Sequence, residues 1–397
     1  MSESINDFFI EVDFHQVCKN KQIVSGDVFL HHRIKDENRV IAVLSDGLGS
    51  GIKANVLATL TSTMALNFIS GSKDIRSTAE TIMKTLPVCK VRKISYSTFS
   101  IADVDNFERI RIIEYDNPPF ILIRDGRQIT IESKQIKLRY NKYKENTLNY
   151  SEFPIRMGDR IVFFSDGVSQ SGIGTKGLPL GWGNGNVAEY ICGQISRKGE
   201  ISARELAQAV AAKAFQNDGY KAKDDITCGV IYFRKPRRCI VLTGPPTSRE
   251  KDPEIASIIS RFDGRKIISG GTTAKIVARE LSAGITVNLK DYDPDIPPGS
   301  AMDGIDLVTE GTITMGKLLE ALENGGEKTA RSGSVLTAFL NMLMDSDVIH
   351  FVVGTKINEA HQDPNIPVEL GLRRNLVKNI VKVLEEKYLK ETRIQFI

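Results

Sequence analysis

The chain has 397 residues, which is long for one hydrophobic core and predicts two or three domains. Its net charge is only +4, and no basic block is interleaved with aromatic residues, so the composition argues against a nucleic-acid partner. No stretch approaches the roughly 20 apolar residues that cross a bilayer, and the N-terminus lacks a signal-peptide pattern. We therefore expect a cytoplasmic protein without membrane association. The five cysteines are never spaced as CxxC, which disfavours a disulfide framework and a structural zinc site.

In the first half of the chain, an apolar strand runs into a glycine-rich turn. Val40–Leu44 is the expected strand and Ser45–Gly51 the turn, and from Ala54 onward apolar residues recur at helical spacing. Glycine lets the backbone approach closely, so the carboxylate of Asp46 and the carbonyl of Gly47 can face one point. Hard divalent cations prefer oxygen ligands of this kind.

The segments on either side of this turn are expected to be mostly strands. The run 27–34 begins with Asp27, which fits a turn cap as well as a metal ligand. Asp125-Gly126 predicts a hairpin turn. Short alternating runs with turn signals between them favour antiparallel sheets over repeated β-α-β units. A helix is expected at 77–86, followed by strands at 97–104, 109–115, 120–125 and 127–133.

Two more segments deliver aspartates to strand ends. Ile161–Phe164 is an apolar run that ends at Asp166, and Asp224 and Asp225 directly precede the strand-like run 228–233. Adjacent like charges repel, and a bound cation would relieve that repulsion. Between these segments we expect a glycine-rich loop at 171–186, either a flap over a site or a surface loop without a role, and an amphipathic helix at 203–217.

In this order and spacing, the acidic motifs resemble the metal-dependent serine/threonine protein phosphatases of type 2C, in the bacterial branch named for stage II sporulation protein E. The resemblance covers about residues 1–235. It implies an α+β sandwich of two stacked antiparallel sheets flanked by helices, with a site for two Mn²⁺ or Mg²⁺ ions at one end. Asp46 would bridge both metals, and the Gly47 carbonyl would bind one of them. Asp166 and Asp224 would hold the first metal, and Asp27 would stand on the side of the second.

The resemblance also implies an activity. A water activated by two metal ions would hydrolyse phosphoserine or phosphothreonine on a bacterial signalling protein, such as an anti-sigma-factor antagonist. Two features depart from many eukaryotic members: Leu48 stands where they carry a histidine, and no arginine precedes Asp27 to grip phosphate. The alternative is a catalytically silent module that binds phosphoproteins or serves as a platform for a homodimer. Loss of acidic ligands would mark that alternative, and none is visible.

The second half has a different pattern. A basic segment at 234–238 ends the first domain, and residues 239–397 alternate apolar strands with helices, which predicts a doubly wound α/β domain. Strands are expected at 239–244, 265–270, 304–311 and 348–354, and helices at 253–261, 273–281, 315–323, 334–344 and 368–386.

One segment of this domain is a candidate anion site. Gly270 and Gly271 are followed by Thr272 and Thr273 at an expected helix N-terminus, where exposed amides attract anions. The competing interpretation makes Thr272 an ordinary N-cap after a tight turn. The segment 244–251 superficially resembles a phosphate-binding P-loop, but it lacks the second glycine before lysine, so that function is rejected. We expect a sensory or regulatory domain that binds a small anionic ligand or a partner protein, or else a bifunctional chain.

Overall fold

The structure is a computed structural model that describes residues 9–34, 37, 39–71, 74–85, 97–105, 109–141, 144–287, 296–324, 334–355, 366–388 and 390–397. Contacts divide the chain into two compact units, Met1–Lys235 and Pro236–Ile397. The expected helix 77–86 corresponds to α2, Ile75–Thr85. No helix in the described ranges is both long and apolar enough to cross a membrane.

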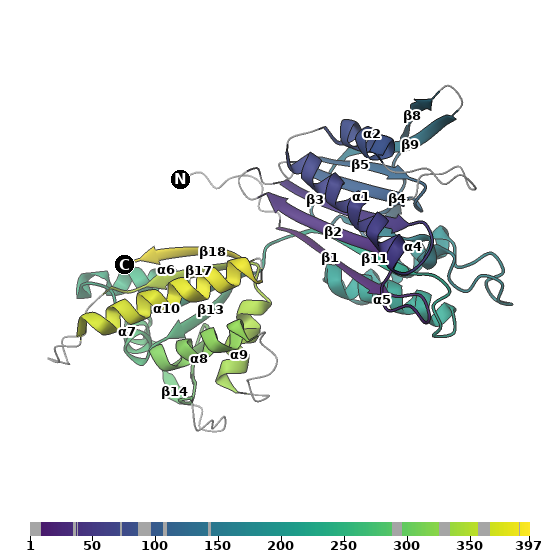
Figure 1. The fold of residues 1–397 in the computed structure, drawn as a ribbon. Helices are drawn as coiled ribbons and strands as arrows, with labels where there is room; N and C mark the ends of the chain where they lie inside the picture. The colour runs from purple at the N-terminus through teal and green to yellow at the C-terminus, as the bar shows by residue number, and fades with distance from the viewer. Residues whose placement is uncertain are drawn as a thin grey trace. The chain divides into compact units, whose positions relative to one another are not determined.

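The first unit contains two antiparallel sheets (Figure 1). One has the strand order β1-β11-β10-β6-β7, and the other has the order β2-β3-β4-β5-β9-β8. The strands of the first are β1 Phe9–Val17, β6 Ile121–Arg124, β7 Arg127–Ile129, β10 Arg160–Phe164 and β11 Ile226–Arg234. Those of the second are β2 Asp27–Ile34, β3 Arg39–Gly47, β4 Ser97–Asp105, β5 Arg109–Tyr115, β8 Lys134–Asn141 and β9 Lys144–Pro154.

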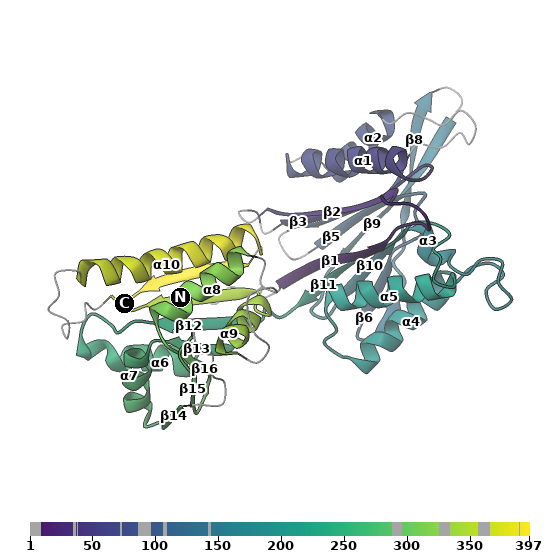
Figure 2. The same cartoon turned by 60° about the horizontal axis from the view of Figure 1, so that its bottom comes forward.

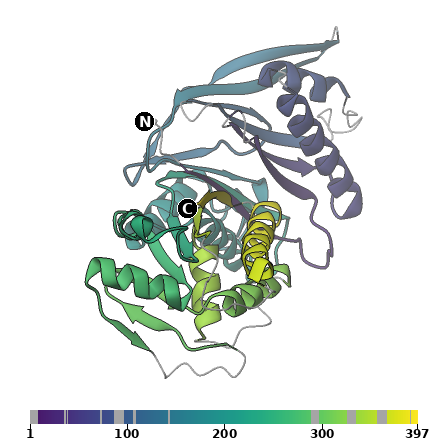
Figure 3. The same ribbon diagram turned by 90° about the vertical axis from the view of Figure 1, so that its left-hand side faces the viewer.

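The two sheets pack face to face, and helices cover both outer faces, as Figures 2 and 3 show. Leu44 of β3, Ile161 of β10 and Phe233 of β11 belong to the core between the sheets. Alternate residues of β3, such as Val43, point outward and pack against α1 (Ile52–Ser70) and α2. This period-two alternation explains why β3 is apolar throughout, because both of its faces are buried.

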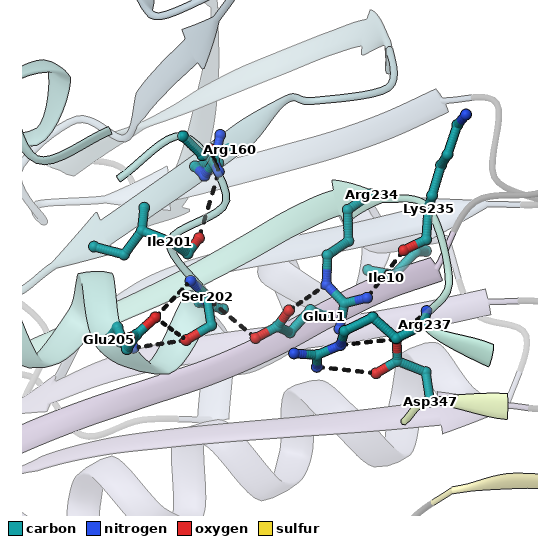
Figure 4. Close-up of polar contacts among 12 residues, drawn as sticks. Ile10, Glu11, Arg160, Ile201, Ser202, Glu205, Arg234, Lys235, Arg237 and Asp347 are labelled. Carbon is teal, nitrogen blue, oxygen red and sulfur yellow. Dashed lines mark hydrogen bonds and ion pairs between the residues drawn. The ribbon is translucent and has the colours of Figure 1, made fainter. Parts of the chain in front are cut away.

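Helices α4 (Asn184–Arg197) and α5 (Ala203–Asn217) cover the other outer face. Ser202 caps α5 in a capping box, since its hydroxyl accepts a hydrogen bond from the Glu205 amide and the Glu205 carboxylate accepts from the Ser202 amide (Figure 4). The next amide, that of Ala203, donates to Glu11 of β1, whose carboxylate also pairs with Arg234 of β11. These contacts fix the start of α5 against β1, the edge strand of its sheet, and the neighbouring strand β11.

The second unit contains one sheet of seven strands, in the order β14-β15-β16-β13-β12-β17-β18. Strands β16, β13, β12, β17 and β18 are parallel, and β15 and β14 extend the β16 edge in antiparallel fashion. Their bounds are β12 Arg238–Thr243, β13 Arg265–Ser269, β14 Ile285–Val287, β15 Ser300–Met302, β16 Ile305–Thr309, β17 Val348–Val353 and β18 Glu391–Phe396. Asp347 anchors the start of β12, because its carboxylate accepts hydrogen bonds from the amide and guanidinium of Arg237 (Figure 4).

Helices lie on both faces of this sheet. On one face, α8 (Thr312–Glu323), α9 (Val335–Met344) and α10 (Ile366–Glu386) pack on alternate strand residues such as Val241 and Phe351. On the other, α6 (Asp252–Ser260) and α7 (Gly271–Leu281) pack on the residues between them, such as Leu242 and Ile268. Figure 2 shows α10 and α7 on opposite sides of the strands.

Several elements were absent from the sequence-based prediction: the edge strands β8, β14 and β18, the strands β9 and β15 next to an edge, and helix α4. The interpretation of 171–186 as a loop holds only up to Gly183, because α4 begins at Asn184. Its tryptophan, Trp182, is not part of an exposed flap. The side chain is 5% exposed and packs edge-on against Tyr190 in the core under α4 and α5. The four cysteines in the described ranges are free thiols.

Candidate functional site

Asp46 lies near the carboxyl end of β3, directly opposite Asp27 at the start of β2. The Asp27 amide donates to the Ser25 hydroxyl within the preceding turn. The turn after Asp46 needs glycine, because a Cβ at Gly47 would lie 2.0 Å from the Ala54 carbonyl oxygen in α1. The Gly47 amide donates to the Gly26 carbonyl, so the two turns are joined at this end of the sheet. Close approach of helix and turn thus explains the glycine that the sequence pattern singled out.

Asp27 also connects the two sheets. Its side chain is 2% exposed, and its Oδ2 accepts a hydrogen bond of 2.7 Å from the Thr227 hydroxyl on β11. Gln16 of β1 donates to the Thr227 hydroxyl and to the Asp27 carbonyl. The sequence left open whether Asp27 caps a turn or binds a metal; in the structure its carboxylate faces the end of the neighbouring sheet.

Asp166 follows β10 and opens the short helix α3, Asp166–Ser169. Ser165 ties the end of β10 to β11, because its hydroxyl donates to the Asp225 carbonyl and accepts from the Thr227 amide. Gly167 is again required by close packing, since a Cβ there would lie 2.1 Å from the Asp225 carbonyl oxygen. Asp166 and the two aspartates before β11 are therefore neighbours at one end of their sheet.

The paired aspartates before β11 have different surroundings. Asp225 is buried, and its two carboxylate oxygens accept hydrogen bonds from the backbone amides of Lys19 and Gly26, each at 2.9 Å. Asp224 is partly exposed, and its Oδ1 lies 3.3 Å from the Lys19 ammonium. Asp225 thus fastens the loop between β1 and β2, whereas Asp224 faces the shared site.

The electrostatics of the site are those of crowded carboxylates. Burial, together with the charges of Asp166 and Asp224, raises the pKa of Asp46 to about 7. Burial, the Asp46 charge and, more weakly, that of Asp225 raise the pKa of Asp27 well above its ordinary value. Burial and Asp224 likewise raise the pKa of Asp166. Residues from four segments far apart in the sequence therefore share one electrostatic environment.

This donor set suits a hard divalent cation. It consists of carboxylate oxygens with the Gly47 carbonyl nearby and contains neither histidine nor cysteine, which matches Mg²⁺ or Mn²⁺ chemistry. Raised pKa values at Asp46 and Asp166 reflect negative charge that a cation would neutralise. Within the described ranges, however, no three acidic, histidine or cysteine side chains are grouped closely enough to hold one metal ion.

Lys19 is a residue of this site that the sequence reasoning missed. It follows β1 in the loop fastened by Asp225, and its ammonium pairs with Asp224. Its charge also opposes the rise in the pKa of Asp166. The sequence has no arginine before Asp27, and Lys19, just after the first strand, is the cation in that part of the chain that reaches the site.

Two other groups of polar residues are not part of this cluster of aspartates: Asp159, and the threonines at the start of α7 in the second unit. Asp159 is fully buried and accepts hydrogen bonds from the Arg124 guanidinium, so it holds the turn before β10 rather than facing the site. In the second unit, Gly270 is the N-cap of α7, and Gly271, Thr272 and Thr273 form its first turn. The interpretation of Thr272 as a plain N-cap was therefore wrong.

A comparison with protein-family models assigns most of the first unit to a known family. The model for stage II sporulation protein E (SpoIIE) matches residues 36–234, half of the chain. The chain belongs to the SpoIIE family. The sequence-based assignment to this branch of the type 2C phosphatases is thereby confirmed, and with it the enzyme class of protein serine/threonine phosphatases. The matched span includes Asp46, Asp166 and Asp224, but it begins after Asp27.

Several solved structures are similar to part of this chain. The phosphatase domain of Bacillus subtilis SpoIIE with a fragment of its regulatory domain has 16% identity and a TM-score of 0.47; the match covers 57% of this chain and 64% of that one. The RsbU and RsbW domains of a Mycobacterium tuberculosis protein have 15% identity and a TM-score of 0.45, over 63% and 67% of the two chains. RsbX in complex with magnesium has 18% identity and a TM-score of 0.40, over 58% and 98%. No curated protein matches this SpoIIE-family chain.

Proposed function

We propose that the first unit is an active phosphatase that removes phosphate from phosphoserine or phosphothreonine on a bacterial signalling protein in the cytoplasm. The observation that carries the proposal is the convergence of Asp46, Asp166 and Asp224 in a SpoIIE-family domain, where their mutual repulsion calls for a cation. A catalytically silent module would have no reason to keep this costly arrangement of buried negative charge.

The proposed metal ligands are Asp46, the Gly47 carbonyl, Asp166 and Asp224, with Asp27 on the side of a second ion. Two Mn²⁺ or Mg²⁺ ions bound there would lower the pKa of a water and offset charge on the phosphoryl oxygens. Asp225 would act as a positioning residue, because it fixes the loop that carries Lys19. Lys19 would orient the substrate phosphate, in place of the arginine that the sequence lacks.

The test is hydrolysis of p-nitrophenyl phosphate and of a phosphoserine protein. We expect turnover with Mn²⁺ or Mg²⁺, loss of turnover in EDTA, and recovery when the metal is added back. Asp46→Asn should abolish turnover, whereas Asp125→Asn, the same change at the exposed β6–β7 turn, should not. A wild-type protein that binds no manganese by elemental analysis after reconstitution would refute the proposal and favour the silent module.

For the physiological substrate, we propose a phosphorylated protein of a partner-switching pathway, of the kind represented by anti-sigma-factor antagonists. The support is family membership and the position of the site at the strand ends of the two sheets. The assay is the release of phosphate from such a protein compared with release from an unrelated phosphoserine protein; equal rates on both would argue against this choice.

For the second unit, we propose a doubly wound α/β domain that senses a ligand and adjusts the phosphatase. The support is its sheet order, with parallel strands leaving the central β12 in both directions and helices on both faces. A chain ending at Lys235 should differ from the full chain in rate or in manganese affinity. Identical values would count against regulation.

A further inference from the structure

The carboxyl edge of the second unit's sheet brings two helix N-termini together. Ligands of open parallel sheets bind beyond this edge. Strand β13 leads through Gly270 into α7, and the neighbouring strand β16 leads through Gly311 into α8. The two N-cap glycines lie close together, because a Cβ added to Gly311 would lie 3.7 Å from the Gly270 Cα. The positive ends of α7 and α8 therefore point at one region.

Neither helix is capped by a side chain. Gly270 and Gly311 cannot provide one, and the first turn of each helix contains no acidic residue. Most helices in proteins satisfy these amides with a serine, threonine, asparagine or aspartate at the N-cap. Two uncapped N-termini that lie close together have a combined capacity to bind the oxygen atoms of an anion.

Buried hydroxyls without partners provide a second, independent indication. Thr273, in the first turn of α7, is 1% exposed, and its Oγ1 has no hydrogen-bond partner among the described residues. That oxygen faces Gly270, since a Cβ placed there would be 3.3 Å away. The absent side chain of Gly270 thus leaves room beside the hydroxyl. Thr314, at the same position of α8, and Thr243, at the end of β12, are also fully buried, and within the part of the chain that the structure describes their hydroxyls have no partner. Such groups are rare unless something else satisfies them.

Two charged side chains border this region. The carboxylate of Glu310 is exposed beside the start of α7, with its Oε1 3.4 Å from the Cβ position of Gly271, and it has no partner in the described ranges. The guanidinium of Arg373 in α10 lies against Gly244, at the end of β12. Amides and an arginine suit a phosphate. A carboxylate next to them would repel a bare anion, but it can accept hydrogen bonds from sugar hydroxyls.

We propose that this edge binds a phosphorylated sugar, either a free sugar phosphate or a ribonucleotide. The phosphate occupies the N-termini of α7 and α8 beside Thr273, and a sugar hydroxyl donates to Glu310. All residues of this binding site belong to the second unit. Only the effect of the ligand on the phosphatase rests on the function proposed above.

The test is calorimetric titration of the full chain, in EDTA so that metal ions do not hold phosphate at the first unit. The titrants are AMP, ribose 5-phosphate and inorganic phosphate. Thr272→Asp places a carboxylate among the exposed amides of α7, which stabilises the helix but competes with the ligand. Thr272→Asn is the matched neutral control. Glu310→Gln tests the sugar contact separately.

We expect AMP or ribose 5-phosphate to bind, with affinity lowered about tenfold or more by Thr272→Asp and about twofold or less by Thr272→Asn. Glu310→Gln should weaken both sugar ligands but not inorganic phosphate. Tighter binding of AMP would identify a nucleotide, and equal binding a sugar phosphate. If neither binds at millimolar concentration, or if Thr272→Asp binds them normally, the proposal is wrong. Asp46→Asn should abolish turnover and keep ligand binding at the second unit, so failure of this proposal and failure of the phosphatase proposal can be distinguished.

Discussion

Asp46→Asn should stabilise the metal-free protein while abolishing its activity. In the wild type, burial and the charges of Asp166 and Asp224 raise the pKa of Asp46 from 3.8 to about 7. The folded state therefore binds a proton more tightly than the unfolded state does. Because the folded pKa is the higher one, wild-type stability falls as pH rises between these two values, and it is constant above them.

The size of the effect follows from the shift. A rise of this extent corresponds to about 4 kcal/mol of unfolding free energy, which is a ceiling because the carboxylate is partly accessible and its neighbours relax. At about pH 8, where Asp46 is ionised, we expect Asp46→Asn to be more stable than the wild type by about 2 kcal/mol. At about pH 4 the two proteins should be nearly equal, because Asp46 is then protonated.

Urea unfolding in EDTA, followed by fluorescence, measures this difference. The only tryptophan, Trp182, is buried in the core of the first unit and reports on that unit. Manganese should raise the stability of the wild type but not of Asp46→Asn. Asp125→Asn, at an exposed turn, should behave as the wild type does. The reasoning is refuted if Asp46→Asn is no more stable than the wild type at the higher pH in EDTA.

Two further outcomes can be measured with the same protein. Lys19→Gln should raise the KM for p-nitrophenyl phosphate about fivefold at saturating manganese and leave kcat little changed. The reason is that a charge pair across about 4 Å of water contributes ~1 kcal/mol. An unchanged KM would show that Lys19 does not bind the phosphate. Glu114→Gln should stabilise the protein by about 2 to 4 kcal/mol at about pH 8 and much less at about pH 5. Burial raises the pKa of Glu114 to about 8, so ionisation of this carboxyl group at the higher pH opposes folding. Urea unfolding at both pH values checks this, and an equal gain at each would contradict the assigned cause.

The parts of the fold that could be predicted from the sequence are those buried on both faces. Strands β3 and β10 are continuous apolar runs that end in Asp-Gly, so their pattern and their ends were both visible. Strand β8, at the edge of its sheet, and the neighbouring strand β9 were missed because both are rich in lysine and asparagine. Helix α4 was missed because Gly183 caps it and Gly185 lies in its first turn.

The candidate site likewise contains residues that the sequence pattern reveals and contacts that it does not reveal. Its aspartates were found because each lies at or near a strand end: Asp27, Asp46 and Asp166 stand beside glycine, and Asp224 stands beside a second aspartate. The hydrogen bond from Thr227 to Asp27 joins residues 200 positions apart, and no local pattern indicates it. The same holds for the contact between Lys19 and Asp224, which depends on how the loop after β1 folds back. Pairings made by the tertiary fold leave no periodic trace in the chain.

The double hydrogen bond of Asp225 affects how mutagenesis of this protein should be interpreted. Its carboxylate holds the amides of Lys19 and Gly26, so replacing it would release a loop and displace a cation without touching a metal ligand. A rate assay alone would not distinguish Asp225→Ala from the loss of a residue that takes part in the reaction. Amide hydrogen exchange in the segment 19–26 would distinguish these two roles. Loss of a residue that positions the loop would speed exchange of the loop amides, whereas loss of a reactive group would not.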